Sequence, residues 1–238
     1  MFENLPEHPH IVVLTGAGVS AESGLKTFRD SGGLWEEHSI MDVATPEAWK
    51  NNPELVLRFY NDRRKQLDEV SPNPAHYALA ELETKFNVHI ITQNVDDLHQ
   101  RAGSHNVIHL HGELRKARSE RFPSLVYTLD HPEIKMGDTC QRGFQLRPHI
   151  VWFGEDVPMI QTASAIVKTA DILLIVGTSL NVYPAAGLIN HAPYGCRKYL
   201  IDPHETHEGS MYNLTHLKEK AGKAVPALLD KFLREFNR

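Results

Sequence analysis

Apolar residues fall into short β-rich runs, each followed by turn residues and then by a stretch with helical periodicity. Runs rich in Val, Ile and Leu occupy residues 11–15, 89–92, 107–110, 149–153, 171–176 and 197–201. Amphipathic stretches that predict helices occupy residues 53–67, 74–85, 96–102, 159–169 and 221–236. Nearly continuous apolar strands that alternate with helices are typical of a parallel sheet covered on both faces. The pattern predicts an α/β protein with a Rossmann-like, doubly wound parallel sheet.

Two long stretches interrupt this alternation. Residues 30–67 separate the first strand from the second and have their own helical pattern after Thr45-Pro46, and residues 113–145 are of mixed polarity. Structureless loops of this length are uncommon in a compact domain. We therefore expect both insertions to pack together as a small second lobe that forms a cleft beside the sheet. The expected division is a large lobe of about residues 1–29, 72–112 and 146–238, and a small lobe of about residues 30–71 and 113–145.

The charge and the cysteine content narrow the partners and the compartment. The chain of 238 residues has a formal net charge of −5 at pH 7, with scattered basic residues, which predicts no nucleic-acid partner. The first residues lack the segments of a signal peptide, and no apolar run approaches the roughly 18 residues that span a bilayer. Cys140 and Cys196 are the two cysteines, too few for a disulfide framework. We expect a cytoplasmic monomer without a membrane partner.

A glycine-rich segment follows the first predicted strand. Gly16-Ala17-Gly18-Val19-Ser20-Ala21 fits the Gly-x-Gly-x-x-Ala pattern of dinucleotide-binding turns between a strand and a helix. An ordinary glycine turn has the same residues, so this segment alone leaves both interpretations open. The usual fingerprint also has an acidic residue about 20 positions on, at the end of a second strand. Glu36 and Glu37 stand near that distance but not at a strand end, which disfavours a hydride-transferring enzyme.

Five segments together resemble the signature of the sirtuin family. They stand in the family's order, and the resemblance reaches from about residue 11 to residue 226. It implies one sirtuin-type catalytic domain over residues 1–238, with NAD-dependent protein-lysine deacylase activity. The segments are residues 16–29 (GAGVSAESGLKTFR), residues 92–99 (TQNVDDLH), His111-Gly112, Val151-Trp152-Phe153-Gly154-Glu155 and Gly177-Thr178-Ser179.

The resemblance also implies the chemistry of the site. Sirtuins consume NAD: they cleave its nicotinamide–ribose bond and join the ribose to the acyl oxygen of an acyl-lysine. The products are free lysine, nicotinamide and an acyl-ADP-ribose. His111 corresponds to the family's catalytic base, a role that suits a side chain with a pKa near neutrality. Asn94 corresponds to a second catalytic residue.

Residues that correspond to the family's NAD contacts gather in the same segments. Amide side chains such as Gln93 can bind the carboxamide and hydroxyls without adding charge beside a developing oxocarbenium ion. Phe28 is expected to cover the reacting ribose, and Asp202 stands where the family commonly has an asparagine. The expected NAD contacts are Gly16, Ala17, Gly18, Ala21, Thr27, Phe28, Arg29, Trp35, Gln93, Asn94, Val95, Asp96, Gly177, Thr178, Ser179, Asp202 and Ala221.

Simpler interpretations of two of these positions remain open. Asp96 could serve only as the cap of the helix that follows it. His109 and His111 alternate along a strand and share one face, as a metal-binding pair would. No carboxylate or cysteine is placed to complete such a site, so we interpret His109 as a packing or hydrogen-bonded residue.

A further resemblance concerns the substrate. The class III sirtuin subgroup, which includes bacterial desuccinylases, demalonylases and deacetylases, has a tyrosine and an arginine three positions apart on one helix face. Tyr60 and Arg63 correspond to this pair, and Ala44 to a small residue near the same pocket. Arg63 could bind a distal carboxylate as a fork while Tyr60 donates to it, so succinyl and malonyl groups are expected to be favoured over acetyl. A tyrosine and a cation on a solvated helix face would show the same spacing.

The substrate peptide is expected to pair as an added strand, a mode that tolerates many sequences. The acyl-lysine proteins that the chain acts on would then be chosen with broad specificity. The residues expected along the peptide are Val151, Trp152, Phe153, Gly154 and Glu155.

Most sirtuins bind structural zinc with four cysteines, and the corresponding residues 113–145 contain only Cys140. Ser119 stands where the first cysteine is expected, and one thiolate cannot form a tetrahedral cysteine site. A mixed site of Cys140, His131, Asp138 and His149 matches no zinc spacing. We predict that zinc is absent and that the small lobe is stabilised by Phe122, Leu125, Val126, Tyr127 and Phe144.

Three functions remain open on these grounds. The first is a deacylase that prefers acidic acyl groups, and the second is protein ADP-ribosylation or mainly deacetylation at the same site. The third is a catalytically idle sensor of NAD or ADP-ribose. A sensor would not need a base near the ribose, so the joint presence of His111, Asn94, Gln93 and Asp96 favours an enzyme.

Overall fold

The computed structural model describes residues 5–25, 34–35, 38–178, 180–204 and 212–236, with only the backbone described at residues 34–35. Its main sheet has six parallel strands in the order β11-β10-β9-β1-β4-β5. The expected parallel α/β sheet is therefore present. The strands are β1 (His10–Thr15), β4 (Asn87–Thr92), β5 (Val107–His109), β9 (Ile172–Val176), β10 (Arg197–Ile201) and β11 (Leu214–Leu217).

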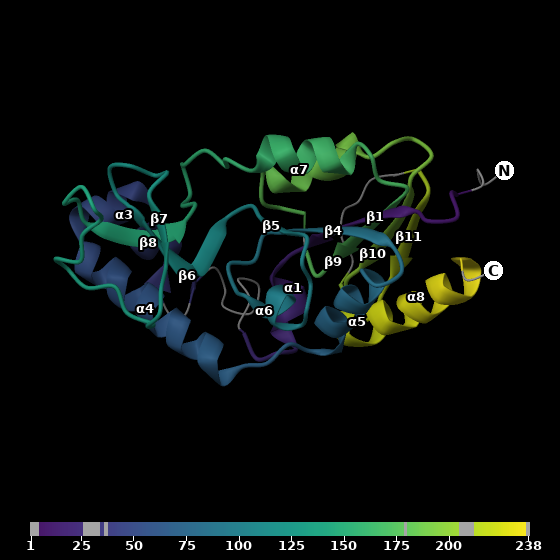
Figure 1. The fold of residues 1–238 in the computed structure, drawn as a ribbon, viewed down its shortest axis with the longest axis horizontal. Coiled ribbons are helices and arrows are strands. Elements are labelled where there is room, and N and C mark those ends of the chain that lie inside the picture. The colour runs from purple at the N-terminus through teal and green to yellow at the C-terminus, as the bar shows by residue number, and fades with distance from the viewer. Residues whose placement is uncertain (1–4, 26–33, 36–37, 179, 205–211, 237–238) are drawn as a thin grey trace.

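Helices cover both faces of this sheet (Figure 1). On one face lie α5 (Pro74–Leu82) and α8 (Ala221–Phe236), and on the other lie α7 (Ile160–Val167) and the 3₁₀ helix η1 (Ala185–His191). None of the described helices is both long enough and apolar enough to cross a bilayer.

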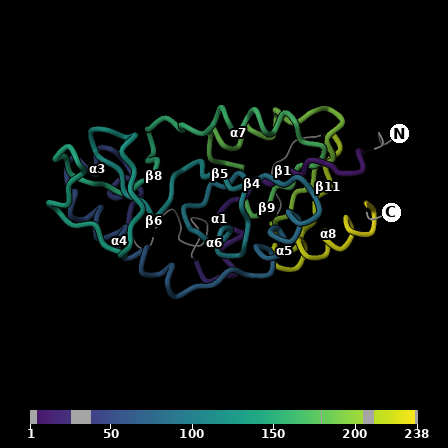
Figure 2. The backbone as a smooth tube through the Cα atoms, viewed as in Figure 1, coloured from purple at the N-terminus to yellow at the C-terminus, as the bar shows by residue number. Residues whose placement is uncertain are grey.

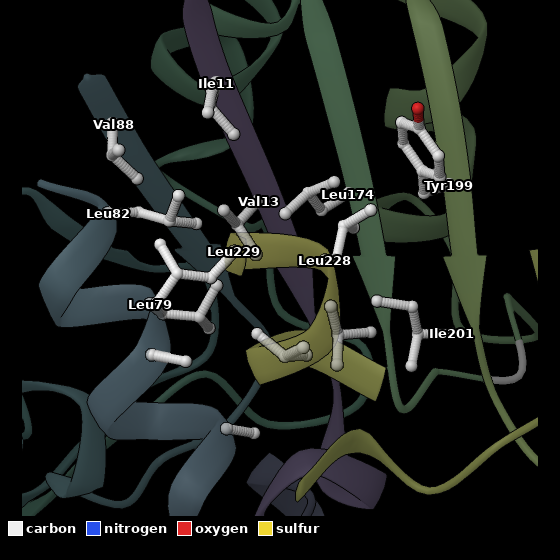
Figure 3. Close-up of a cluster of buried hydrophobic side chains, with 14 of the residues drawn as sticks. Ile11, Val13, Leu79, Leu82, Val88, Leu174, Tyr199, Ile201, Leu228 and Leu229 are labelled. Atoms are coloured by element: carbon white, nitrogen blue, oxygen red, sulfur yellow. The ribbon is translucent and has the colours of Figure 1, made fainter. Parts of the chain in front are cut away.

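Alternate side chains of each strand enter two separate cores. Ile11 and Val13 of β1 pack with Leu79 of α5 and Leu228 of α8, in the cluster drawn in Figure 3. Their neighbours on β1 point the opposite way, toward α7 and η1, as the period-2 geometry of a strand requires. The central strand β9 is apolar at all five positions because both faces of the sheet are covered.

The carboxyl ends of four neighbouring strands lie level with one another. Thr15 is in register with Thr92 and Val176, and Val176 with Ile201. From β1 the chain builds outward through β4 to β5, and it later adds β9 to β11 on the opposite side of β1. The direction of building reverses between β1 and β9, and ligands of doubly wound proteins bind at such a point. The segments that meet there are residues 16–18, 93–96, 177–178 and 202–204.

A second, antiparallel sheet lies at the other end of the molecule, beside α3 (Pro46–Asn51) and α4 (Pro53–Glu69) (Figure 2). Its strand order is β7-β6-β8, with β6 at Gly112–Ser119, β7 at Val126–Thr128 and β8 at Leu146–Ile150. The shorter elements are α1 (Ala17–Ala21), β2 (Leu34–Trp35), β3 (His38–Ser39), α2 (Ile40–Val43) and α6 (Leu98–Arg101).

Two sequence-based expectations need correction here. The run at residues 149–153 is not a strand of the main sheet, because β8 ends at Ile150 and pairs antiparallel with β6. Strand β11 was not expected, since it is a short edge strand in which two polar residues, Thr215 and His216, stand between two leucines. The expected lobe boundary at residues 145 and 146 falls inside the three-stranded sheet, and the division into lobes stays a prediction.

The buried centre beside the small sheet also differs from the expected one. Leu57 of α4 packs with Ala117 of β6 and with Ile134. The residues proposed to form this core are only partly buried, and Val126 is 39% exposed. Phe122 and Phe144 do contact each other edge to face, with ring centroids 5.4 Å apart.

Two turns meet at Cys140 and Ser119. Cys140 Sγ donates to Ser119 Oγ at 3.3 Å, and both side chains are buried. The guanidinium of Arg142 lies 4.5 Å from the ring centroid of Phe122, and that of Arg121 lies 5.0 Å from Phe144. Hydrogen bonding and cation–π contacts thus join the two turns.

Helix α4 fixes a further loop through a buried guanidinium. Arg64 is fully buried, and its Nε donates to Pro132 O at 2.7 Å and its Nη1 to Leu114 O at 3.4 Å. Asn61, one turn earlier, bonds Arg64 and both the N–H and the C=O of Ile134. Burial lowers the pKa of Arg64 to about 10, so the side chain stays charged at neutral pH.

Replacement Arg64→Met is expected to lower the free energy of unfolding by about 2 kcal/mol, because it leaves buried carbonyl groups without their donor. Lys65→Met is the matched control. Lys65 is the next residue on the helix, its side chain is half exposed, and it pairs with Glu133 at the surface, so a loss within about 0.5 kcal/mol is expected. Urea unfolding measures both. Equal losses would show that the guanidinium does not fix this loop.

Candidate active site

Three glycines allow the loops after β1 and β9 to touch. Gly16 N donates to Val176 O at 3.0 Å, and Gly18 N donates to Gly177 O at 2.8 Å. A Cβ on Gly18 would lie 2.7 Å from Gly177 Cα, and one on Gly177 would lie 2.3 Å from Val19 N. Gly177 also has a φ of +61°, in the left-handed region that favours glycine. Packing of the two loops against each other therefore requires glycine at these positions.

A cavity of about 870 Å³ opens at this edge of the main sheet and extends to α4 and β8. This volume is within the usual range for ligand pockets. The cavity therefore brings expected NAD, catalytic and acyl-group residues around one space. The expected site residues that line it are Gly16, Ala17, Gly18, Ala21, Ala44, Tyr60, Arg63, Gln93, Asn94, Val95, Asp96, His111, Val151, Trp152, Phe153, Gly154, Glu155, Gly177, Thr178, Asp202 and Ala221.

Some expected contacts cannot be placed around this cavity. Thr27, Phe28, Arg29 and Ser179 lie outside the described residues. Trp35 belongs to β2, and only its backbone is described. Their roles stay predictions.

Asn94 is held by a buried polar network after β4. Its Nδ2 donates to Gly16 O and to Ser20 Oγ, both at 3.1 Å, and its backbone N donates to Thr92 Oγ1 at 3.0 Å. Thr92 Oγ1 also accepts from Thr15 Oγ1 at 2.8 Å. A primary amide has two N–H donors, and Asn94 uses both within the chain. The side chain can therefore offer a ligand only its carbonyl oxygen.

Ser20 is a site residue that the sequence analysis assigned no role. It donates to Asp96 Oδ2 at 2.9 Å and so links the glycine-rich segment to the loop after β4. Asp96 Oδ1 accepts from Leu98 N at 3.1 Å, so the carboxylate bonds the first residue of α6, although the N-cap residue of this helix is Asp97. Burial raises the pKa of Asp96, although the bonds from Leu98 and Ser20 act against this. The position of Ser20 within the glycine-rich segment of residues 16–21 was the feature of the sequence that could have indicated this role.

His111 follows β5 and bonds the backbone of the loop that carries Gln93. Its Nδ1 lies 3.1 Å from Gln93 O. A carbonyl oxygen can only accept, so Nδ1 carries the proton and Nε2 of the neutral ring keeps its lone pair. Burial lowers the pKa of His111 below its ordinary value, although the bond to Gln93 acts in the opposite direction. The ring is therefore neutral at physiological pH and can accept a proton at Nε2.

His109 has the role that the sequence suggested for it. Its Nδ1 lies 3.0 Å from Asn94 O, and its Nε2 lies 2.6 Å from Gln100 Nε2. Both ring nitrogens are thus used in hydrogen bonds. Among the residues that the structure describes, no three metal-ligating side chains converge, and the absence of zinc stays a prediction that metal analysis can test.

Polar groups from three loops reach the end of the cavity that lies next to Gly16 and Gly177. Gln93 Nε2 donates to Thr178 Oγ1 at 3.1 Å. The carboxylate of Asp202 accepts from His204 N at 2.9 Å, and that of Glu22 accepts from Gly222 N, at the start of α8, at 2.8 Å. Both carboxylates are therefore bonded to backbone amides of the chain.

The other end of the cavity holds the tyrosine and the arginine of α4. Tyr60 is fully buried and Arg63 is 7% exposed, so this pair does not lie on a solvated helix face. Burial raises the pKa of Tyr60 well above its ordinary value, so the hydroxyl keeps its proton at neutral pH. Ala44, 2% exposed, lines the same end. The pair can therefore present a neutral hydroxyl and a cation to one group.

The segment after β8 is fixed at each of its first three residues. Val151 N donates to His111 O at 2.9 Å, and Phe153 N donates to Ala44 O at 3.0 Å. Trp152 N donates to Glu155 Oε2 at 2.8 Å, and the Trp152 side chain is 2% exposed. A peptide that pairs with these three residues must donate to their carbonyl groups, since their N–H groups are used within the chain.

Comparison with known proteins identifies the family. The sequence profile of the Sir2 family matches residues 16–184. The chain belongs to the Sir2 family. This result confirms the sirtuin identity expected from the five segments. The chain is similar to the NAD-dependent protein deacylase of Helicobacter pylori strain J99, at 54% identity over 224 residues, which covers 94% of this chain and 95% of that protein.

Two solved structures of Sir2 homologues have the same fold. One, a point mutant in complex with ADP-ribose, is 39% identical with a TM-score of 0.88 and covers 96% of this chain and 93% of that chain. The other, a complex with NAD, is 39% identical with a TM-score of 0.86 and covers 95% of this chain and 90% of that chain. The expected Rossmann-like α/β class is therefore confirmed for this Sir2 chain.

Replacement Gly177→Ala is expected to destabilise the Sir2 fold by at least about 2 kcal/mol more than Gly143→Ala. Both glycines have positive φ, but a Cβ at Gly143 meets nothing within 4 Å, whereas one at Gly177 meets the backbone of Gly18 and Val19. The control therefore carries only the conformational cost of about 1 kcal/mol, and the difference measures the close approach of the loops. Urea unfolding gives both values, and similar losses would contradict the packing argument.

Proposed function

We propose that this Sir2 chain removes acyl groups from protein lysines with consumption of NAD, and that it favours acyl groups that end in a carboxylate. Succinyl and malonyl groups have this form, and acetyl groups are expected to be accepted more weakly. The observation that carries the proposal is the burial of Tyr60 and Arg63 at one end of the cavity that also contains His111.

NAD-dependent protein deacylation is the part of this function that the comparisons confirm. The relative from Helicobacter pylori has that name, and it matches this chain over nearly the full length of both. The preference for acidic acyl groups and the roles of single residues are our proposals. They rest on the geometry of the cavity.

The nucleotide side of the cavity fits a dinucleotide. Its rim at Gly16, Ala17 and Gly18 has almost no side chain, so a pyrophosphate can approach the backbone. The N–H groups of Gly16, Gly18 and Val19 are bonded within the chain, so these glycines contribute open space more than hydrogen-bond donors. Bound NAD would supply the ribose carbon that accepts the acyl oxygen.

His111 and Asn94 then have complementary tasks. His111 Nε2 can take the proton of a ribose hydroxyl, since Nδ1 is fixed by Gln93 O. Asn94 directs its carbonyl oxygen at the ligand, since both of its N–H donors are bound by Gly16 and Ser20. Neither residue places a formal charge beside the carbon that becomes positive in the reaction.

The far end of the cavity suits a carboxylate. A buried guanidinium gains from a bidentate anion, because charge-assisted hydrogen bonds are strong where water is excluded. The neutral Tyr60 hydroxyl can donate to the same group. An acetyl group has no distal carboxylate for either side chain to bind, so it gains no charge-assisted hydrogen bond from this pair.

We also infer a cytoplasmic location for the chain. Cys140 and Cys196 are both free and buried, which is typical of proteins in a reducing compartment. A monomeric state and the absence of a nucleic-acid partner stay predictions.

Replacement Arg63→Met is expected to lower kcat/KM for a succinyl-lysine peptide by about 10- to 100-fold, the loss of a charge-assisted hydrogen bond. Turnover of the acetyl peptide is expected to fall much less. Arg58→Met is the matched control, since Arg58 is an exposed cation of the same helix. Equal turnover of both peptides by the wild type, unaffected by Arg63→Met, would defeat the acidic preference but not the deacylase. Release of nicotinamide without any peptide turnover would favour ADP-ribosylation, and no release at all would favour a sensor.

The acidic limb of the kcat/KM profile is expected to lie below pH 6.5, because the lowered pKa of His111 keeps the base neutral to lower pH. Activity should fall as pH drops through this lowered pKa, and His111→Ala should reduce kcat/KM by about 10²- to 10⁴-fold. His105→Ala, which changes a side chain that is 86% exposed, should leave the limb in place. Near-normal turnover by His111→Ala would show that another group is the base.

A further inference from the structure

Glu155, expected to lie along the substrate peptide, has a carboxylate that is occupied within the chain. Its Oε1 accepts from Arg147 Nη1 at 2.7 Å. Its Oε2 accepts from Arg147 Nη2 at 3.0 Å, from Arg118 Nη2 at 3.0 Å and from Trp152 N at 2.8 Å. A carboxylate has about four acceptor sites, and these bonds use four. Glu155 therefore has little capacity left for a peptide backbone.

Arg147 and Glu155 form a fork that also supports Trp152. The Arg147 guanidinium lies 3.3 Å from the centroid of the Trp152 ring, and its Nη2 donates to Ile150 O at 3.0 Å. Burial opposes the charged form of Glu155, but the hydrogen bonds and charge of Arg147, the Trp152 N–H and the charge of Arg118 together outweigh it and hold the pKa of Glu155 below its ordinary value. The fork is thus ionised at neutral pH. It fixes both the backbone and the ring of Trp152.

Trp152 in turn contacts the acyl end of the cavity. Its Nε1 lies 3.1 Å from the Tyr60 hydroxyl, and this contact is buried. An indole N–H can only donate, so Tyr60 accepts in this bond and its own proton is not used in it. Because the indole occupies one lone pair of the hydroxyl oxygen, the bond restricts the directions in which the Tyr60 O–H can point.

We propose that Trp152, Arg147 and Glu155 are positioning residues for acyl selection: the Arg147–Glu155 fork holds the indole, and the indole fixes the ring and hydroxyl of Tyr60. This inference rests on the proposed preference for acidic acyl groups. It assigns specificity to side chains that act through Tyr60. A fixed hydroxyl favours a carboxylate because less conformational freedom is lost when the acyl group binds.

Replacement Trp152→Phe tests the bond, because it removes the indole N–H and keeps an aromatic ring over Arg147. The ratio of kcat/KM for succinyl and acetyl peptides is expected to fall about three- to tenfold, as for one neutral hydrogen bond, chiefly through KM of the succinyl peptide. Trp49→Phe is the matched control: its ring lies 5.9 Å from that of Trp152, but its Nε1 donates to Glu120 at 3.3 Å. An equal fall in both variants would overturn the proposal.

Replacement Glu155→Gln tests the Arg147–Glu155 fork. The double variant Glu155→Gln, Trp152→Phe tests whether Glu155 acts through Trp152. If Glu155 acts through Trp152, then the Glu155→Gln change adds little to the ratio once Trp152 is phenylalanine. Additive losses would overturn this order. Should Glu155→Gln fail to fold, Trp152→Phe and its control still decide the central bond.

The indole ¹H–¹⁵N signals provide a readout that a merely structural role would not move. The Trp152 signal, assigned by its loss in Trp152→Phe, is expected to shift in Tyr60→Phe, while the Trp49 signal stays in place. An unmoved Trp152 signal would overturn the contact. If the wild type and Arg63→Met each show equal kcat/KM for the succinyl and acetyl peptides, then the proposed acidic preference and the proposed positioning role are both wrong. A Trp152 signal that still responds to Tyr60→Phe then separates that failure from a wrong contact.

Discussion

The site depends on how closely the loops after β1 and β9 approach each other. Level strand ends bring these loops together at the switch point of the sheet, and a Cβ at Gly18 or Gly177 would enter the backbone of the opposite loop. Two amides of the first loop bond the end of β9 and its loop. The same contact leaves a rim without side chains next to the cavity. The packing of the two loops and the open rim of the cavity therefore both depend on these glycines.

Around this contact the chain places polar groups whose directions are fixed by other buried groups. Ser20 joins the first loop to Asp96 and Asn94, and the carbonyl of Gln93 fixes the tautomer of His111. The region around His111 and Asn94 thus contains a neutral imidazole and an amide oxygen, while Arg63 places a positive charge at the α4 end of the cavity. Under the proposed function, a neutral base suits a reaction in which positive charge develops on a sugar carbon, and Arg63 suits an acyl group with a negative end.

The sequence predicted the sheet from local patterns, and most of the residues named from the family resemblance line one cavity. Apolar runs set the strands, and the motifs stand at strand ends, where parallel packing must gather them. The sequence-based prediction was wrong where pairing between distant segments determines which sheet a strand joins. Residues 149–153 look like a buried strand of the main sheet, yet β8 pairs with β6 of the smaller sheet. The contacts of Ser20 and Trp152 were also missed, because they cross 76 and 92 positions of the chain.

Helix α4 both lines the cavity and holds a distant loop in place, and the sequence gives no sign that these two properties are linked. Tyr60 and Arg63 line the acyl end of the cavity, and the adjacent positions Asn61 and Arg64 fasten the loop at Pro132 and Ile134. The axial rotation of one helix therefore governs both, since turning it would misplace all four side chains at once. Under the proposed acyl preference, substitutions in the loop near residue 132 that turn this helix would change the substrate range without any substitution in the pocket itself.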